Sequence, residues 1–591
     1  QFSSRRFDLH IFLPPCRQQL PAMTKSKELS PRLRFAASSL LLHLRPTNSF
    51  STATPPSVKS IADAPAPFKW PFIGTLPDFL SRGGIDKFAE VHESMYRDFG
   101  PVYSMSILGD DTIVLCDPII FDSILRKEGK FPIGGTEGVS TFIDYYEENN
   151  VTMALNMFQS GPEWKEWRDS LNPDMFAAWT TYLPSIAQTC RKISDVAGAE
   201  VPKHIPFVDF ISRAAFDMFE TVMYGSSSFT TNSKVAKPED IEFVMASQAA
   251  FDITGALLSN PMEKLFEGDL YKKFVVNMDK TFSFARKRTK KYADLALMDQ
   301  QQAQQPQPSK QSKQFFFADE VSADAGVDEE SSKCPVQKIR NAIPTKFVNP
   351  SFIERLVHRG ELNNEDISEL GAPLLMAGVD TTAYVMSWLY LNLASNPDVQ
   401  TKLAEELHSV LKGADLTTVE QMDSLPYLRA CIRESHRLTP PVPIQAKKLK
   451  QEVDIVLPNG DIYHVEAGKR IFLNLRAFPM DPQFVDNPTK YQPERFLPEA
   501  IEARKGTPSE IIDHPNFEDP FGRGKRRCLG GSVAKAEIMI LAARLIQDWE
   551  ISLVDPLDAT RWTAKQKLML KADPYPAMKL LRRKRNEISW S

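Results

Sequence analysis

Cysteine is scarce in this chain, which has six in 591 residues. They stand at positions 16, 116, 190, 334, 431 and 528, with no paired spacing. The sequence therefore predicts neither a disulfide framework nor a zinc or iron–sulfur cluster, and it favours a reducing compartment. A glycine-rich dinucleotide fingerprint is missing as well, so we expect the electrons for any redox reaction to come from outside the chain.

Excess charge and long apolar runs are missing too. The formal net charge is −4, and residues 1–60 are rich in Lys and Arg, so the remainder is acidic. We therefore expect no nucleic-acid partner. The apolar stretch at 35–44 is too short to span a bilayer. We expect no transmembrane helix, and peripheral contact with a membrane stays open.

The head of the chain has a biased composition. Residues 23–59 are rich in Arg, Ser, Thr and Leu, and Glu28 is their only acid. This composition is typical of an organelle transit peptide. We interpret residues 1–61 as a leader and favour the mitochondrion over the plastid; a disordered tail is the alternative.

A proline-rich segment at 64–71 stiffens the entrance to a domain, which we place at 62–591. Within it, residues 300–335 are Gln-rich and then acidic, with too little apolar surface to pack. They are predicted to form a disordered insertion in a surface loop.

The most informative stretch is FGRGKRRCLG at 521–530, which precedes a predicted helix over 532–549. Its glycines let the backbone turn sharply and approach something flat or charged. Cys528 stands at the helix start, where unpaired N–H groups stabilise a thiolate, and Arg526 adds positive charge. Such a thiolate is a good ligand for haem iron. An ordinary cysteine in a turn is the alternative, but the spacing Phe-x-x-Gly-x-x-x-Cys-x-Gly favours haem.

This pattern resembles the haem loop of the cytochrome P450 family, and further family motifs follow in the family's order from about residue 62 to the end. The resemblance implies a mainly α fold with a small β-rich lobe, a helical prism that holds haem b between two helices. Cys528 is then the axial thiolate and metal ligand. Phe521, Arg526 and Gly530 are then cofactor-binding residues of the same loop.

A long apolar helix is predicted over 364–395, with Ala377-Gly378-Val379-Asp380-Thr381 at its centre. Glycine inside a helix costs about 1 kcal/mol, which is understandable if a haem face lies against the backbone at Ala377 and Gly378. The resemblance implies that Thr381 hydrogen-bonds the oxygen on the iron and that Asp380 relays protons for O–O cleavage. Taken alone, the motif also fits a helix kink with a satisfied threonine.

Pro373 lies one turn ahead of this motif. It lacks the N–H that would bond the Glu369 carbonyl. We therefore expect the helix to be distorted from this point, earlier than is usual in the family.

Two further positions point to the haem carboxylates. Trp164 and Arg168 are four residues apart in a predicted helix and share a face, where the Arg can form a charge-assisted pair. The alternative is a surface Arg beside a core Trp. Because the Cys528 loop predicts a haem, we favour the haem-carboxylate interpretation. Lys447 stands where the family often has an Arg, and a Lys supplies charge without the bidentate fork.

Glu434 and Arg437 form an i, i+3 pair in a predicted helix at 428–438, and Arg495 lies in the segment Pro-Glu-Arg-Phe further on. Ion pairs at this spacing are common on surfaces, so the pair alone means little. The resemblance implies that the three residues form a structural network behind the haem loop.

The implied reaction is insertion of one oxygen atom from O2 into an apolar substrate, such as a sterol, a terpenoid or a fatty acid. Two alternatives stay open: a peroxide isomerase or dehydratase of the same fold that needs no O2, and a haem-binding protein without turnover. The intact Asp380-Thr381 pair argues against the isomerase. The aromatic, loop-like stretch at 131–146 and the region 251–266 are expected to shape the substrate pocket.

Basic residues around the haem loop, Arg523, Lys525, Arg527 and Arg433, suit an acidic ferredoxin as the electron donor. Together with the leader, they make the chain resemble the mitochondrial type of the family. The alternative is that some of these arginines serve only the haem carboxylates.

Overall fold

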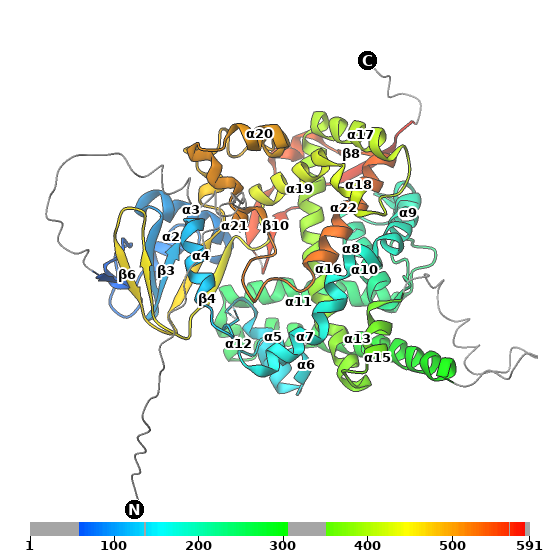
Figure 1. The fold of residues 1–591 in the computed structure, drawn as a ribbon, viewed down its shortest axis with the longest axis horizontal. Helices are drawn as coiled ribbons and strands as arrows, with labels where there is room; N and C mark the ends of the chain where they lie inside the picture. Colours follow the sequence, from blue (N-terminus) through cyan, green and yellow to red (C-terminus); the bar gives the residue numbers. More distant parts are fainter. Residues whose placement is uncertain (1–57, 135–136, 305–349, 567, 585–591) are drawn as a thin grey trace, which may run out of the picture. The chain divides into compact units, whose positions relative to one another are not determined.

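Helices make up most of the described chain, which in this computed structural model comprises residues 58–134, 137–304, 350–566 and 568–584 (Figure 1). These residues belong to a unit that spans 53–591. Nearly all of the predicted leader and most of the predicted insertion lie outside the described residues. The helices are α2 (Leu76–Ser81), α3 (Phe88–Phe99), α4 (Pro118–Arg126), α5 (Ser140–Glu148), α6 (Thr152–Asn156), α7 (Pro162–Phe176), α8 (Ala178–Thr181), α9 (Leu183–Glu200), α10 (Phe207–Tyr224), α11 (Pro238–Ser259), α12 (Pro261–Leu265), α13 (Asp269–Gln304), α15 (Phe352–Arg359), α16 (Asn364–Ser395), α17 (Pro397–Leu411), α18 (Val419–Asp423), α19 (Pro426–Leu438), α20 (Pro498–Ala503), α21 (Pro515–Glu518) and α22 (Gly531–Asp548).

The long helix α16 runs through the middle of the helical part. The Asn363 side chain caps it by accepting a hydrogen bond from the Asp366 N–H at 2.9 Å, and the helix begins at Asn364, where the sequence predicted it. Acidic residues in the first turn favour the positive end of the helix dipole. The helix packs against α10 and α13, and most of its residues are buried, as expected of a helix that is apolar all round.

The helix α16 contains Pro373, where the sequence predicted a distortion, and continues through it without a break. A proline inside a helix removes one backbone hydrogen bond and costs about 3 kcal/mol. Pro373 is buried, and the contacts of α16 with α10 and α13 hold the helix together despite this cost.

The β-rich part contains a sheet of strand order β2-β3-β7-β4 and a second sheet of order β1-β6-β5. β2 and β3 form a hairpin, with Ile107 opposite Asp110 and Gly109 at a φ of +85° in the turn. β1 begins at Val58, so the sheet includes residues ahead of the domain boundary predicted at 62. The strands are β1 (Val58–Ser60), β2 (Val102–Ile107), β3 (Asp110–Leu115), β4 (Ile444–Lys448), β5 (Val453–Val456), β6 (Ile462–Val465), β7 (Arg470–Asn474), β8 (Trp549–Leu553), β9 (Thr563–Gln566), β10 (Leu570–Asp573) and β11 (Met578–Arg582).

The aromatic stretch predicted as a loop contains the helix α5 instead. Phe142 and Tyr146 are four residues apart and lie buried on one face of this helix, a spacing that indicates a helix rather than a loop. Phe142 packs against Phe251 of α11 at 5.4 Å and against Phe274 of α13 at 5.5 Å between ring centroids. The stretch therefore joins α11 and α13 in one apolar cluster.

Among the described helices, α11 is the one long and apolar enough to cross a membrane by length and composition. Half of its apolar window is buried inside the fold. Its contacts with α13, α16 and α10 account for this apolar character as core packing.

Candidate active site

Cys528 lies at the end of a tight loop that leads into α22. The backbone N–H of Cys528 donates to the Phe521 carbonyl at 2.9 Å, which closes the loop. Gly522 and Gly524 have φ values of +73° and +82°, in the left-handed region that favours glycine. A Cβ atom at Gly531 would lie 3.1 Å from the Phe521 ring, so this glycine lets the ring pack against the helix start.

The Cys528 side chain has exposed surface, yet the protein around it is dense enough that desolvation raises the pKa of the thiol above its ordinary value. The Gly530 backbone and the charges of Arg168 and Arg527 lower that pKa, while Asp519 raises it. The helix start thus favours the thiolate as the sequence predicted, but desolvation outweighs it. A positive ion bound to sulfur would shift the balance to the thiolate.

Arg526 holds this loop against the segment that carries α5 and α6. Its guanidinium lies 4.2 Å from the centroid of the Trp164 ring. It donates to the carbonyl of Pro132 at 2.9 Å and to that of Met157 at 2.8 Å, and also to that of Gln159. The guanidinium is therefore occupied by backbone carbonyls, and its place in the site is to fix the loop.

Arg168 lies one turn after Trp164 on α7 and faces the same loop. Its side chain is partly buried, and desolvation lowers its pKa, while the nearby Cys528 raises it. Within the described residues Arg168 has neither a hydrogen-bond partner nor an ion-pair partner, so its guanidinium fork is available for an anion. The sequence predicted this residue for a haem carboxylate.

At the centre of α16, Ala377 is exposed whereas Gly378 lies against a neighbouring helix. Ala377 is exposed although α16 is mostly buried, and the Thr381 hydroxyl donates to the Ala377 carbonyl at 2.6 Å. Gly378 points elsewhere, because a Cβ atom there would lie 2.7 Å from the Phe219 ring of α10. The small size of Gly378 makes room for Phe219, a contact that the sequence did not predict.

Asp380 turns from α16 toward α11 and is 1% exposed. Its Oδ2 accepts a hydrogen bond from the Ser247 hydroxyl, whereas its Oδ1 has no hydrogen-bond partner among the described atoms. Burial raises the pKa of this carboxyl to about 7, helped by the charge of Asp252 and opposed by Ser247 and Lys571. Asp380 can therefore take up and release a proton near neutral pH.

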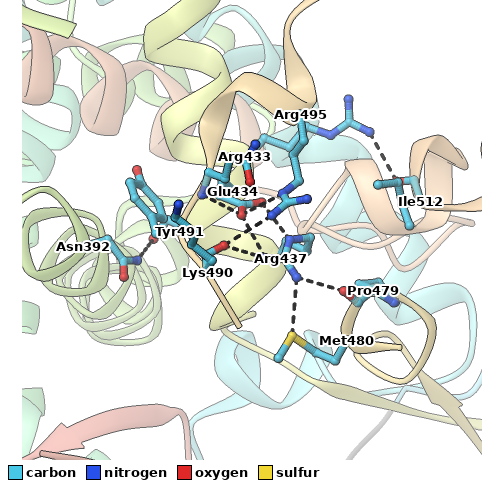
Figure 2. A network of polar contacts seen from close by, with 12 residues as sticks. Asn392, Arg433, Glu434, Arg437, Pro479, Met480, Lys490, Tyr491, Arg495 and Ile512 are labelled. Carbon is cyan, nitrogen blue, oxygen red and sulfur yellow. Dashed lines mark hydrogen bonds and ion pairs between the residues drawn. The ribbon is translucent and has the colours of Figure 1, made fainter. Parts of the chain in front are cut away.

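Glu434, Arg437 and Arg495 meet in one buried network (Figure 2). Glu434 Oε2 accepts from Arg437 Nε at 2.7 Å, and its Oε1 accepts from Arg437 Nη2 at 2.8 Å and from Arg495 Nε at 2.9 Å. The Gln492 N–H adds a hydrogen bond at 3.0 Å, and Arg437 also donates to the Pro479 carbonyl at 2.8 Å. The structure thus brings together the three residues that the sequence placed in one network.

Lys447 is used differently from the prediction. Its Nζ donates to Glu128 Oε1 at 2.7 Å, and both side chains are buried. Glu128 Oε2 also accepts the Lys525 N–H at 3.2 Å, and a Cβ atom at Gly524 would lie 2.4 Å from it. The Lys447 charge is therefore balanced inside the protein rather than free for a haem carboxylate. Sequence reasoning missed Glu128, which no motif singled out.

The basic surface predicted around the loop is smaller than expected. Arg433 pairs with Asp513 at 2.9 Å and is mostly buried, so it presents no free charge. Lys525 and Arg527 also have partners within the fold. Arg523 is exposed and has no partner among the residues that the structure describes. This corrects the assignment of Arg433 and leaves Arg523 as the unpaired cation of the four.

The donors of this site fit a haem. Cys528 offers a thiol with exposed surface, and the exposed Ala377 and partly exposed Thr381 lie on α16, which contacts α22. Arg168 offers an unpaired, partly buried guanidinium. A sulfur ligand for iron together with a guanidinium for a carboxylate matches the chemistry of haem b.

Comparison with known proteins agrees with this chemistry. Residues 65–577 match the family described as Cytochrome P450. The chain belongs to the cytochrome P450 family, which confirms the predicted family, the fold class and the class of enzyme, a haem-dependent monooxygenase.

Three relatives show the range of the family around this chain. It is 25% identical over 529 residues to 2-hydroxyisoflavanone synthase of Glycyrrhiza uralensis, covering 88% of this chain and 89% of the relative. It is 22% identical over 512 residues to 1,25-dihydroxyvitamin D(3) 24-hydroxylase, mitochondrial, of Rattus norvegicus, covering 84% and 85%. It is 23% identical over 519 residues to sterol 26-hydroxylase, mitochondrial, of the same species, covering 84% and 85%.

Proposed function

We propose that this chain inserts one oxygen atom from O2 into a sizeable apolar substrate, with electrons from a ferredoxin-type donor. The observation that carries the proposal is the placement of Cys528 and of the Asp380-Thr381 pair: α16 bears the pair and contacts α22, into which the Cys528 loop leads. When bound, haem b held by the Cys528 sulfur would supply the activation of O2.

Cys528 would hold the iron through its sulfur, and Arg168 would hold a haem carboxylate. Arg526 and Trp164 keep the loop in register with the segment opposite it, as their stacking at 4.2 Å supports. Phe521 and Gly530 shape the loop around the sulfur, and Ala377 keeps α16 from crowding the cofactor. The network of Glu434, Arg437 and Arg495 stabilises the fold behind the loop.

Thr381 and Asp380 supply protons in this proposal. The Thr381 hydroxyl bonds the Ala377 carbonyl, and rotation about its side chain directs the same proton away from the helix. Asp380 is the neighbouring reservoir, because its pKa of about 7 leaves both protonation states accessible. Positioned proton transfer of this kind contributes about 10²- to 10⁴-fold in rate.

The substrate class follows from the cluster around α5. Phe142, Phe251, Phe274 and Met376 pack together, and Met376 precedes the exposed Ala377 on α16. Apolar and aromatic walls of this kind suit a sizeable, weakly polar molecule. The relatives are by name a 1,25-dihydroxyvitamin D(3) hydroxylase, a sterol hydroxylase and a 2-hydroxyisoflavanone synthase, and these names support a sterol, a terpenoid or a similar polycyclic lipid over a short fatty acid.

A ferredoxin-type donor and a mitochondrial location go together. Two of the relatives are mitochondrial by name, and the basic composition of residues 23–59 agrees with import. The exposed, unpaired Arg523 on the Cys528 loop offers an acidic donor a point of attraction. A plastid location is the alternative that import into isolated organelles would reveal.

The test uses the purified full chain loaded with haem. We expect the reduced, carbon-monoxide-bound protein to absorb at the position of a thiolate-ligated haem, and the Cys528→Ser variant to lose that absorption. Product must then form from a lipid that shifts the spin state on binding, and only with O2 and a ferredoxin chain present. Turnover of a lipid hydroperoxide without O2 or reductant would overturn the monooxygenase proposal, as would haem binding without any turnover.

A further inference from the structure

Asp380 has no direct access to the solvent from which it would regain a proton. It is 1% exposed, and its one hydrogen bond comes from Ser247, which is itself buried. A residue that gives up a proton in each catalytic cycle must regain one from solvent. Ser247 cannot be the inlet, because it has no exposed surface.

A polar cluster beside Asp380 does reach solvent. The Tyr384 hydroxyl, one turn after Asp380 on α16, donates to Asp252 Oδ1 at 3.0 Å. Lys571 of β10 donates to Asp252 Oδ2 at 3.0 Å. About a third of each of the Asp252 and Lys571 side chains is exposed, at 35% and 32%. The cluster thus runs from the surface to the helix turn that carries Asp380.

We infer that Asp252, Tyr384 and Lys571 form a proton inlet that resupplies Asp380 from solvent. The inference rests on the proposed role of Asp380. It assigns Asp252 and Lys571 as positioning residues, since neither touches substrate or the reacting atoms.

The proton passes in three transfers without any change in electron count. Asp252 takes a proton from solvent and passes it to the oxygen of Tyr384. The Tyr384 hydroxyl bonds Asp252 in the structure, so a movement of the Tyr384 side chain brings it to Asp380 Oδ1, which has no hydrogen-bond partner among the described atoms, and there it releases its own proton. Asp380 then gives a proton to the Thr381 hydroxyl, which releases its own proton on the side of the exposed Ala377, so that one proton enters the chain of groups and one leaves it.

The charges around Asp380 suit this task. Asp252 raises its pKa and Lys571 lowers it, while the Ser247 hydroxyl of α11 lowers it by stabilising the carboxylate. Asp209 of α10 lies close enough to Lys571 that the lysine lowers its pKa. The two members of the surface pair therefore act on Asp380 with opposite signs, which provides a test that does not depend on turnover.

The first experiment measures the carboxyl vibration of Asp380 against pH in the haem-free full chain, labelled with 13C at aspartate. The Asp380→Asn variant identifies the band. Asp252→Asn is expected to lower the titration midpoint, because a neighbouring negative charge is removed. Lys571→Met is expected to raise it, because a positive charge is removed.

A matched control comes from the β-rich part. Lys59 and Asp461 form a pair at 2.8 Å with both side chains 35% exposed, and they lie on β1 and beside β6. Asp461→Asn removes the same charge with similar exposure. It is expected to leave the Asp380 midpoint unchanged.

The second experiment measures product formed per O2 consumed in the haem-loaded chain. Asp252→Asn and Tyr384→Phe are expected to lower this ratio, by up to about 100-fold, and to raise the solvent deuterium isotope effect. Asp252→Glu, which keeps the carboxyl, is expected to restore most of it.

The outcomes separate the two proposals. If Asp380→Asn keeps the wild-type ratio, the proposed role of Asp380 is wrong, and the inlet with it. If Asp380→Asn lowers the ratio but Asp252→Asn and Tyr384→Phe do not, the inlet alone is wrong. Midpoint shifts of the same sign in Asp252→Asn and Lys571→Met would also overturn the inlet.

Discussion

The two buried carboxylates Glu434 and Asp380 differ in the number of hydrogen bonds that they accept. Glu434 has no exposed surface and accepts hydrogen bonds from Arg437, Arg495 and the Gln492 N–H. Asp380 is buried to a similar degree but accepts one hydrogen bond, and one of its oxygens has no partner. A carboxylate bound by two guanidinium groups and a backbone N–H holds distant segments together, whereas a buried carboxylate with a single donor can exchange its proton.

The largest effect is expected from breaking the complete network. Glu434→Ala leaves Arg437 and Arg495 as uncompensated buried charges, a loss of roughly 3–5 kcal/mol. We expect the variant to retain little or no haem, measured as the ratio of haem to protein absorbance after purification. Glu494→Ala, on a partly exposed side chain of the neighbouring segment, is the control and should retain haem. Normal haem content in Glu434→Ala would show that the network does not support the site.

Replacing Asp380, the carboxylate with one hydrogen bond, should change the free energy of unfolding by an amount that depends on pH. The folded-state pKa of Asp380 is raised to about 7, so its contribution to stability is fully present below the unfolded-state pKa, near 4, and is lost as the pH rises to about 7. Asp380→Asn removes this dependence. Relative to wild type, the haem-free variant should gain up to about 4 kcal/mol between pH 4 and pH 8.

Urea unfolding of both proteins across this range measures the gain. A constant difference between the two proteins would show that Asp380 is already ionised in the fold. Asp279→Asn serves as the comparison, because that aspartate accepts from Tyr145 at 2.7 Å in a partly exposed position.

A smaller effect separates packing from cofactor contact on α16. Gly378→Ala places a Cβ atom 2.7 Å from the Phe219 ring, so we expect a loss of about 1–3 kcal/mol from overpacking. The double variant Gly378→Ala with Phe219→Leu should recover part of this loss in thermal unfolding of the haem-free chain. If the single variant is as stable as wild type but binds haem less tightly, Gly378 faces the cofactor after all.

The smallest effect concerns partnered and unpartnered cations at the surface. Arg523→Ala removes an exposed charge without a partner in the described chain, and we expect a few-fold weaker binding of a ferredoxin-type donor with a flatter salt dependence. Arg433→Ala should act on stability instead, because Arg433 pairs with Asp513. Titration of the donor at two ionic strengths distinguishes them. Equal weakening by both variants would contradict this division.

Spacing along the chain was enough to predict the residues that act through local geometry. The Cys528 loop and the helix α16 with its Asp380-Thr381 pair follow from patterns within a few residues of each other. The network of Glu434, Arg437 and Arg495 joins distant segments, and it could be assembled only because the family resemblance linked them.

What sequence reasoning missed depends on neighbours far away in the chain. Nothing near Gly378 signals Phe219 of α10, and nothing near Lys447 signals Glu128 at the end of α4. A lone basic residue such as Arg433 gives no sign of whether an acid will meet it in the fold. Periodicity within residues 131–146 did carry a signal for α5, and it was overlooked in favour of the irregular composition around it.

The hydrogen bonds of Arg526 connect the Cys528 loop to the segment that carries α5 and α6. One set ends on the Pro132 carbonyl, ahead of α5, and the other on the Met157 and Gln159 carbonyls, just past α6. A guest molecule that pushes the aromatic helix α5 outward must therefore pull on the same guanidinium that steadies the metal-binding loop. A displacement of α5 is in this way transmitted through Arg526 to the Cys528 loop.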